Sequence, residues 1–132
     1  MTTPTYVIIG AGLAGAKAAE ACGTGTSAVR SSCSAPRTIC PTNVRPLSKD
    51  YLAGKKEPDE FTVQPASWYR EHDIDLRLNT TVKTIDRAAH AVGYQDGKHE
   101  HYDKLLLATG SASRRPPLPG SDSDGVHYLR TV

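Results

Sequence analysis

The chain has 132 residues, a formal net charge of +2 and 38% hydrophobic residues. This length supports one domain with a hydrophobic core, and so small a net charge does not by itself indicate nucleic-acid or membrane binding. No apolar run approaches the roughly 20 residues of a transmembrane helix, and the N-terminal residues 1–6 lack the basic region of a signal peptide. We therefore predict a cytoplasmic protein with no nucleic-acid or membrane partner.

The first element in chain order is an apolar strand over Thr5–Ile9 that runs into a glycine-rich turn. The turn has the pattern G-x-G-x-x-G, and an alanine-rich helix is predicted after it over Leu13–Ala21. In dinucleotide-binding turns the first glycine permits the tight turn, the second lets a pyrophosphate approach, and the third lets the helix pack on the strand. The helix N-terminus directs free N–H groups toward the phosphates. The candidate phosphate-binding residues are Gly10, Gly12, Leu13, Ala14 and Gly15.

Residues 22–44 follow neither helical nor strand periodicity and are predicted to be loop. This stretch holds all three cysteines, and no Asp or Glu occurs between Ala21 and Lys49. A β-α-β unit requires a second strand here, and the pattern predicts none, although so long a structureless connection is unusual inside a compact domain. The cysteine spacing fits neither a zinc site nor a C-x-x-C redox pair. We predict no metal site.

The rest of the chain has a clearer pattern. Alternation of apolar and polar residues predicts short strands, and a turn at Asp96-Gly97 connects two of them. The apolar run Leu105–Leu107 resembles the first strand and predicts a further strand of a parallel sheet. The four short strands between residues 73 and 101 are therefore predicted to form an antiparallel meander inserted in an α/β domain. The expected elements are helices at 48–54 and 65–72, strands at 73–78, 81–86, 91–95, from 99 and at 102–107, and an extended linker at 111–120.

Together these segments resemble the pyridine-nucleotide–disulfide oxidoreductase superfamily, in its ferredoxin and rubredoxin reductase-like branch. The resemblance implies an α/β, Rossmann-like FAD-binding domain, here incomplete, in which a parallel sheet with helices carries the antiparallel meander. It implies that residues 1–115 are part of this domain and that residues 116–132 are a linker toward an absent NAD(P)-binding domain. The matching segments are Tyr6–Gly15, Arg45–Lys49, Trp68-Tyr69, Leu105–Ser111 and Pro117–Gly120.

The resemblance also implies which residues contact the cofactor. The glycine turn would hold the FAD pyrophosphate, the segment Pro46–Lys49 would lie near the isoalloxazine ring, and the backbone of Val82 would meet the adenine. The A-T-G element after the apolar run would close over the FAD. No catalytic acid or base is identified, because the hydride chemistry belongs to the cofactor. The residues implied in this way are Arg45, Lys49, Val82, Ala108, Thr109 and Gly110.

Members of this superfamily branch are NAD(P)H-dependent flavoprotein oxidoreductases. They pass hydride from NAD(P)H to FAD and electrons to a ferredoxin- or rubredoxin-type iron–sulfur carrier. We expect this chain to be an N-terminal fragment of such an enzyme, inactive on its own. Two alternatives remain open: a truncated remnant that binds no flavin, and a stand-alone module that binds NAD or an adenine nucleotide through the glycine turn alone.

The chain departs from the fingerprint in one respect. An acid that holds the ribose is expected about 20 residues past the glycines, but Ala35, Pro36 and Arg37 stand there. We hypothesise that residues 22–45 are aberrant because they are read in the wrong frame. If each third codon base is regrouped with the next two bases, one permitted reading is ALRDRDFGGPVVLLGAEDHLPYERPP, followed by Leu47. It contains an apolar strand and places an acid at the position of Arg37. The alternative is a genuine low-complexity loop.

Overall fold

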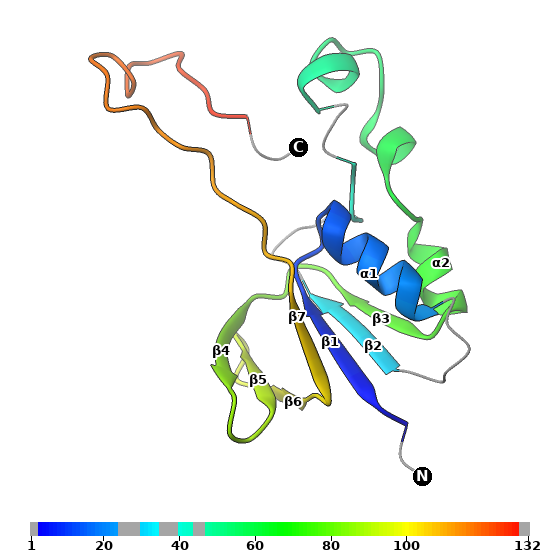
Figure 1. Ribbon diagram of the computed structural model, residues 1–132. Coiled ribbons are helices and arrows are strands. Elements are labelled where there is room, and N and C mark those ends of the chain that lie inside the picture. The colour runs from blue at the N-terminus through cyan, green and yellow to red at the C-terminus, as the bar shows by residue number, and fades with distance from the viewer. Residues whose placement is uncertain (1–2, 24–29, 35–39, 44–46, 130–132) are drawn as a thin grey trace.

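The computed structural model describes residues 3–23, 30–34, 40–43 and 47–129, which form two sheets and two α-helices (Figure 1). The four-stranded sheet has the order β3-β2-β1-β7, and all its neighbouring strands are parallel. Its strands are β1 (Thr5–Ile9), β2 (Arg30–Ser34), β3 (Ile74–Arg77) and β7 (Lys104–Leu107). The antiparallel sheet has the order β4 (Val82–Asp86), β5 (Ala91–Tyr94) and β6 (His99–His101). The predicted α/β fold with an inserted meander is confirmed.

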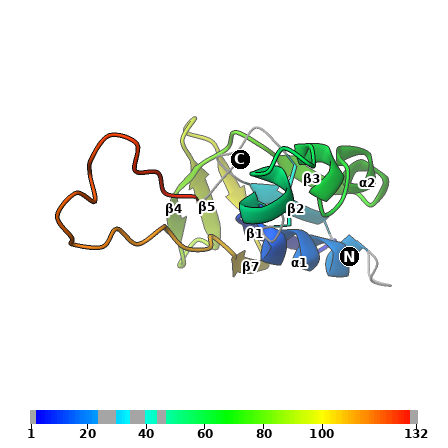
Figure 2. The same cartoon turned by 90° about the horizontal axis from the view of Figure 1, so that it is seen from above.

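Strand β1 connects the two cores of the molecule, because successive side chains of a strand point to opposite faces. On one face, Ile8 belongs to a buried cluster with residues from α1 (Leu13–Gly23) and α2 (Ala66–Glu71). On the other face, Val7 and Ile9 pack with residues of the meander. Figures 1 and 2 show the same division, with α1 and α2 on one side of the parallel sheet and β4–β6 on the other. Since both faces are covered, β1 reads as a continuous apolar run.

The prediction of loop throughout residues 22–44 is wrong at Arg30–Ser34, which forms β2. Strand β2 pairs in parallel with β1 on one side and with β3 on the other. The local sequence did not indicate a strand because Ser and Arg favour none. Pairing with two neighbours imposes the extended conformation instead, and such tertiary context commonly overrides β-propensity. Apart from β2, the structure describes only residues 22–23 and 40–43 of the segment 22–45, which we hypothesised to be read in the wrong frame.

Two short elements lie between β2 and α2. Where a helix was expected at residues 48–54, the structure has a π-helical turn, η1 (Leu47–Tyr51). A 3₁₀ turn, η2 (Pro58–Phe61), occupies a stretch expected to be polar loop. Pro58 begins η2. Proline suits the first position of a helix because its fixed φ matches the helical value and because no hydrogen bond needs its missing N–H there. Phe61 is buried and meets the ring of Tyr51 edge-on, at 5.6 Å between centroids. This contact holds the two turns together.

Helix α2 falls within the expected range 65–72, and strands form where alternation predicted them. The assignment of the strand at 73–78 to the meander is wrong, because this strand is β3, which pairs in parallel with β2 in the four-stranded sheet. Alternation within a strand does not identify the strand with which it pairs. Beyond β7 the chain has neither helix nor strand as far as residue 129, is mostly exposed, and turns back on itself at residues 119–125 (Figure 1). Within the described ranges, no helix has the length and apolar character needed to cross a membrane.

Candidate dinucleotide-binding site

The turn after β1 is closed by the end of β7. Gly10 has φ of +117°, a conformation that favours glycine because a side chain would be strained. A Cβ on Gly10 would overlap the carbonyl group of Ala108 and lie 3.0 Å from the backbone nitrogen of Thr109. The Ala108 N–H donates a hydrogen bond to the carbonyl of Ile9, at 2.8 Å. The first glycine therefore lets two segments that are distant in sequence meet at the carboxyl edge of the sheet.

The other two glycines of the turn have opposite surroundings. A Cβ on Gly15 would overlap the carbonyl oxygen of Gly10, so only glycine lets α1 pack this closely on the turn. A Cβ on Gly12 would meet nothing within 4 Å. The carbonyl of Gly12 accepts a hydrogen bond from the Ala16 N–H at 3.0 Å, so the helix begins immediately after it. The turn is thus closed at its first and third glycines and open at its second, as the approach of a pyrophosphate requires.

The start of α1 lies on this open side. Leu13 and Ala14 are exposed at its N-terminus, where helices leave backbone N–H groups without intrahelical acceptors. Ala11, between the first two glycines, was not among the predicted site residues. It is 2% exposed and belongs to the core cluster with Ile8 and Tyr69, so it anchors the turn from beneath. Its small size between two glycines was the signal available in the sequence.

The A-T-G element forms the second wall of the site. Thr109 and Gly110 are exposed directly after β7, and Gly110 has φ of +73°. Ala108 is half-buried and packs against the core cluster under α1. Because Gly10 and Ala108 approach so closely, the structure brings this element and the glycine turn together, as the resemblance implied.

The other implied cofactor residues are more scattered. Lys49 is exposed on η1, and the segment that contains it lies beyond the carboxyl edge of the sheet in Figure 1. Val82 begins β4, pairs with Tyr94 and packs against the cluster that contains Val7. Arg45 lies outside the described residues. The structure therefore brings the glycine turn and Ala108 together, whereas Lys49 and Val82 belong to separate elements.

A charged cluster at the end of β3 was missed by sequence reasoning. Arg77 donates hydrogen bonds to Glu100 (Nη1 to Oε2, 2.8 Å), to the Tyr94 hydroxyl (3.0 Å) and to Asp75 (Nε to Oδ2, 2.7 Å). The Tyr94 hydroxyl in turn donates to Glu100. Burial tends to lower the pKa of Arg77, but hydrogen bonding to Asp75 and attraction to Glu100, Tyr94 and Asp75 raise it overall. This cluster joins the parallel sheet to the meander through three strands that are separate in sequence.

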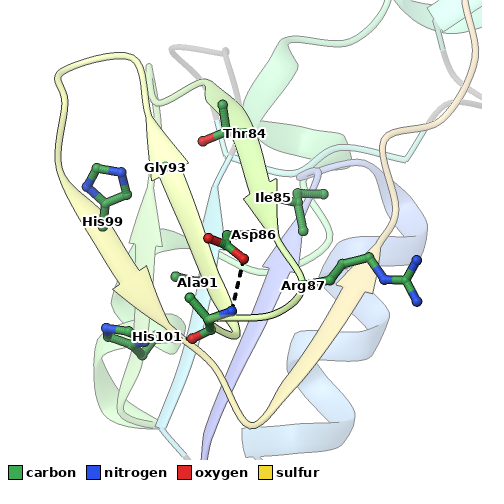
Figure 3. Close-up of a pocket in the computed structure, with 9 residues that line it drawn as sticks. Thr84, Ile85, Asp86, Arg87, Ala91, Gly93, His99 and His101 are labelled. Atoms are coloured by element: carbon green, nitrogen blue, oxygen red, sulfur yellow. Dashed lines mark hydrogen bonds between the residues drawn. The ribbon is translucent and has the colours of Figure 1, made fainter.

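A cavity of about 740 Å³ lies on the outer face of the meander (Figure 3). Ala91 and Gly93 lie on the central strand β5, between β4 and β6, and leave space there because alanine has only a methyl group and glycine has no side chain. The Asp86 carboxylate accepts a hydrogen bond from the backbone of Ala89 at 2.9 Å. None of the predicted site residues lines this cavity. Its lining residues are Thr84, Ile85, Asp86, Arg87, Ala89, Ala91, Gly93, His99 and His101. Within the described ranges, no three His, Cys, Asp or Glu side chains are grouped to hold a metal ion.

The residues present fit a dinucleotide in part. The open Gly12 between two closed glycines suits the phosphates, and the N-terminus of α1 faces the same side. The ribose side lacks its usual partner, because no Asp or Glu occurs anywhere between Ala21 and Lys49. The described residues therefore resemble the phosphate-binding half of such a site, without the carboxylate that normally accompanies it.

The parallel sheet, the glycine turn and the inserted meander define a Rossmann-type dinucleotide-binding domain. Residues 4–132 match the family model for pyridine nucleotide-disulphide oxidoreductases, and the chain belongs to this family. It is 41% identical to rhodocoxin reductase from Rhodococcus erythropolis over 66% of its own length and 20% of that protein. It is 35% identical to the ferredoxin–NAD(+) reductase component of the biphenyl dioxygenase system from Paraburkholderia xenovorans, over 97% of its own length and 31% of that protein.

Solved structures agree with this assignment. A ferredoxin reductase from Rhodopseudomonas palustris superposes with a TM-score of 0.85 at 28% identity, covering 98% of this chain and 32% of that one. The reductase in a covalent putidaredoxin reductase–putidaredoxin complex gives a TM-score of 0.80 at 34% identity, over 90% of this chain and 28% of that one. The chain thus spans about a third or less of the length of these relatives.

Proposed function

We propose that this chain is the pyrophosphate-binding part of the FAD domain of an NAD(P)H-dependent reductase. The observation that carries the proposal is the open Gly12 between the closed Gly10 and Gly15, with Ala108 held against the turn. In the complete reductase, FAD would accept hydride from NAD(P)H and pass electrons to an iron–sulfur carrier of the ferredoxin or rubredoxin type. Relatives named as ferredoxin and rubredoxin reductases support this acceptor class.

Each part of this chain has a limited task in the proposed site. Residues 10–15 would bind and orient the pyrophosphate through backbone N–H groups and the helix dipole. Residues 108–110 would cover the cofactor from the end of β7. Lys49 and Arg45 would lie toward the flavin ring, and Val82 toward the adenine. We further propose that residues 1–115 are part of the FAD domain and that residues 116–132 connect it to an NAD(P)-binding domain.

A ligand comparison tests the proposal. The purified chain is titrated separately with FAD, riboflavin and NAD⁺, with binding followed by flavin fluorescence and by calorimetry. Recognition through the glycine turn predicts that FAD binds more tightly than riboflavin, which has no pyrophosphate, and more tightly than NAD⁺. Tighter binding of NAD⁺ would instead identify a nucleotide module. Equal affinity for FAD and riboflavin, or no binding of any of the three, would contradict the proposal.

A further inference from the structure

The residues of β2 do not suit its position in the sheet. Strand β2 pairs with β1 through Ser31 opposite Tyr6 and with β3 through Ser31 opposite Ile74, so it is an interior strand. Interior strands of parallel sheets are normally near-continuous runs of Val, Ile and Leu. Its neighbour β1 has this character, with side chains 1–9% exposed over residues 7–9. Strand β2 instead has the sequence Arg-Ser-Ser-Cys-Ser.

The genetic code supplies an explanation. A serine codon of the TCN type, read one base earlier, becomes NTC and encodes Phe, Leu, Ile or Val. A cysteine codon, read one base earlier, becomes NTG and encodes Leu, Met or Val. Residues 31–34 are Ser, Ser, Cys and Ser. With TCN serines, all four positions become apolar in the shifted frame, whichever base comes first.

The apolar run of the permitted shifted reading and the observed strand then coincide in position. The shifted reading places the apolar run Val-Val-Leu-Leu at positions 31–34, and the structure places β2 at Arg30–Ser34. The backbone register sets positions 32–34 opposite Val7, Ile8 and Ile9. We infer that residues 22–45 are encoded one base out of frame, through one base lost near Ala21 and one gained near Pro46. The in-frame segment forms a conventional apolar β2 of the same length and register.

The frame inference goes beyond the proposed function, since neither of its tests involves a cofactor. The first test is the set of codons in the coding DNA. The inference requires TCN codons at Ser31, Ser32 and Ser34, and a shifted frame without stop codons from 21 to 46. An AGY codon at any of these serines, read one base earlier, becomes NAG and encodes Lys, Gln, Glu or a stop. Such a codon would overturn the inference.

The second test is the stability of the chain as it stands. The double substitution Ser31→Val/Ser32→Val adds one valine to each face of β2, because neighbouring residues point to opposite faces. The matched control Ser111→Val/Ser123→Val places the same change at two exposed positions beyond β7. If the position of β2 inside the sheet favours apolar residues, the melting temperature of the β2 variant should rise by about 5 °C or more. The melting temperature of the control should hardly change. An unchanged or lower melting temperature for the β2 variant, or an equal rise in the control, would refute the inference.

Discussion

The ion pair between Arg77 and Glu100 offers a quantitative test of how the meander is attached. The substitution Arg77→Met removes the cation but keeps much of the side-chain stem. The Arg77 side chain is 31% exposed and that of Glu100 is 15% exposed. Exposed pairs contribute about 0–1 kcal/mol, and loss of one partner of a fully buried pair costs about 3–5 kcal/mol. This partly buried pair lies between these limits, so we expect a loss of about 2 kcal/mol, or about 8 °C in melting temperature.

The assay is thermal and urea unfolding of a double-mutant cycle with Arg77→Met, Glu100→Gln and the double variant. We expect a coupling energy of about 1–2 kcal/mol, because each single change leaves the other charge partly desolvated. The control is Arg115→Met, since the Arg115–Asp122 pair has side chains 70% and 79% exposed. Its loss should change stability by less than about 0.5 kcal/mol. Equal effects of Arg77→Met and Arg115→Met would refute the reasoning from burial.

Two further predictions concern single positions. Gly15→Ala should lower stability by about 1–3 kcal/mol, measured by urea unfolding, because its Cβ would overlap the carbonyl oxygen of Gly10; a neutral result would show that α1 does not pack closely on the turn. Hydrogen bonds from the side chain and backbone of Lys98 lower the pKa of Asp96. A carboxyl with a lowered folded-state pKa stabilises the fold above its unfolded pKa and loses this contribution as pH falls through the folded pKa. Carboxyl NMR titration of Lys98→Met should show the Asp96 pKa moving back up, and an unchanged value would contradict that assignment.

The local parts of the fold could be predicted from the sequence. Strand β1, the glycine turn and α1 are contiguous, and their apolar run, glycines and alanines each favour the observed structure. The strands of the meander were predicted for the same reason, since alternation and the Asp96-Gly97 turn are local signals, but these signals could not show that the strand at 73–78 pairs with β2 instead. Strand β2 could not be predicted from the residues that the chain carries there, because its conformation comes from pairing with β1 and β3; only the shifted reading frame indicated a strand in this segment.

The candidate site shows a similar division. The role of Gly12 follows from the motif, and the structure shows the open space that this role requires. The contact between Gly10 and Ala108 joins residues at opposite ends of the chain, so only the resemblance to known reductases indicated it. The cluster of Arg77, Tyr94 and Glu100 had no sequence signal, because parallel pairing of β3 and antiparallel pairing of β5 with β6 bring its members together.

The open middle glycine of the turn is the centre of the proposed cofactor site, and the variant Gly12→Ser tests its role most directly. Serine fits the protein there, since nothing lies within 4 Å of its Cβ, and it suits the residue before a helix. It would, however, occupy the space that a pyrophosphate enters. The decisive measurement is the dissociation constant for FAD of the parent chain and of Gly12→Ser, alongside their melting temperatures. We expect affinity to fall about tenfold or more, a loss of about 1.4 kcal/mol, with the melting temperature unchanged. Equal FAD affinity in the two chains would contradict the central claim.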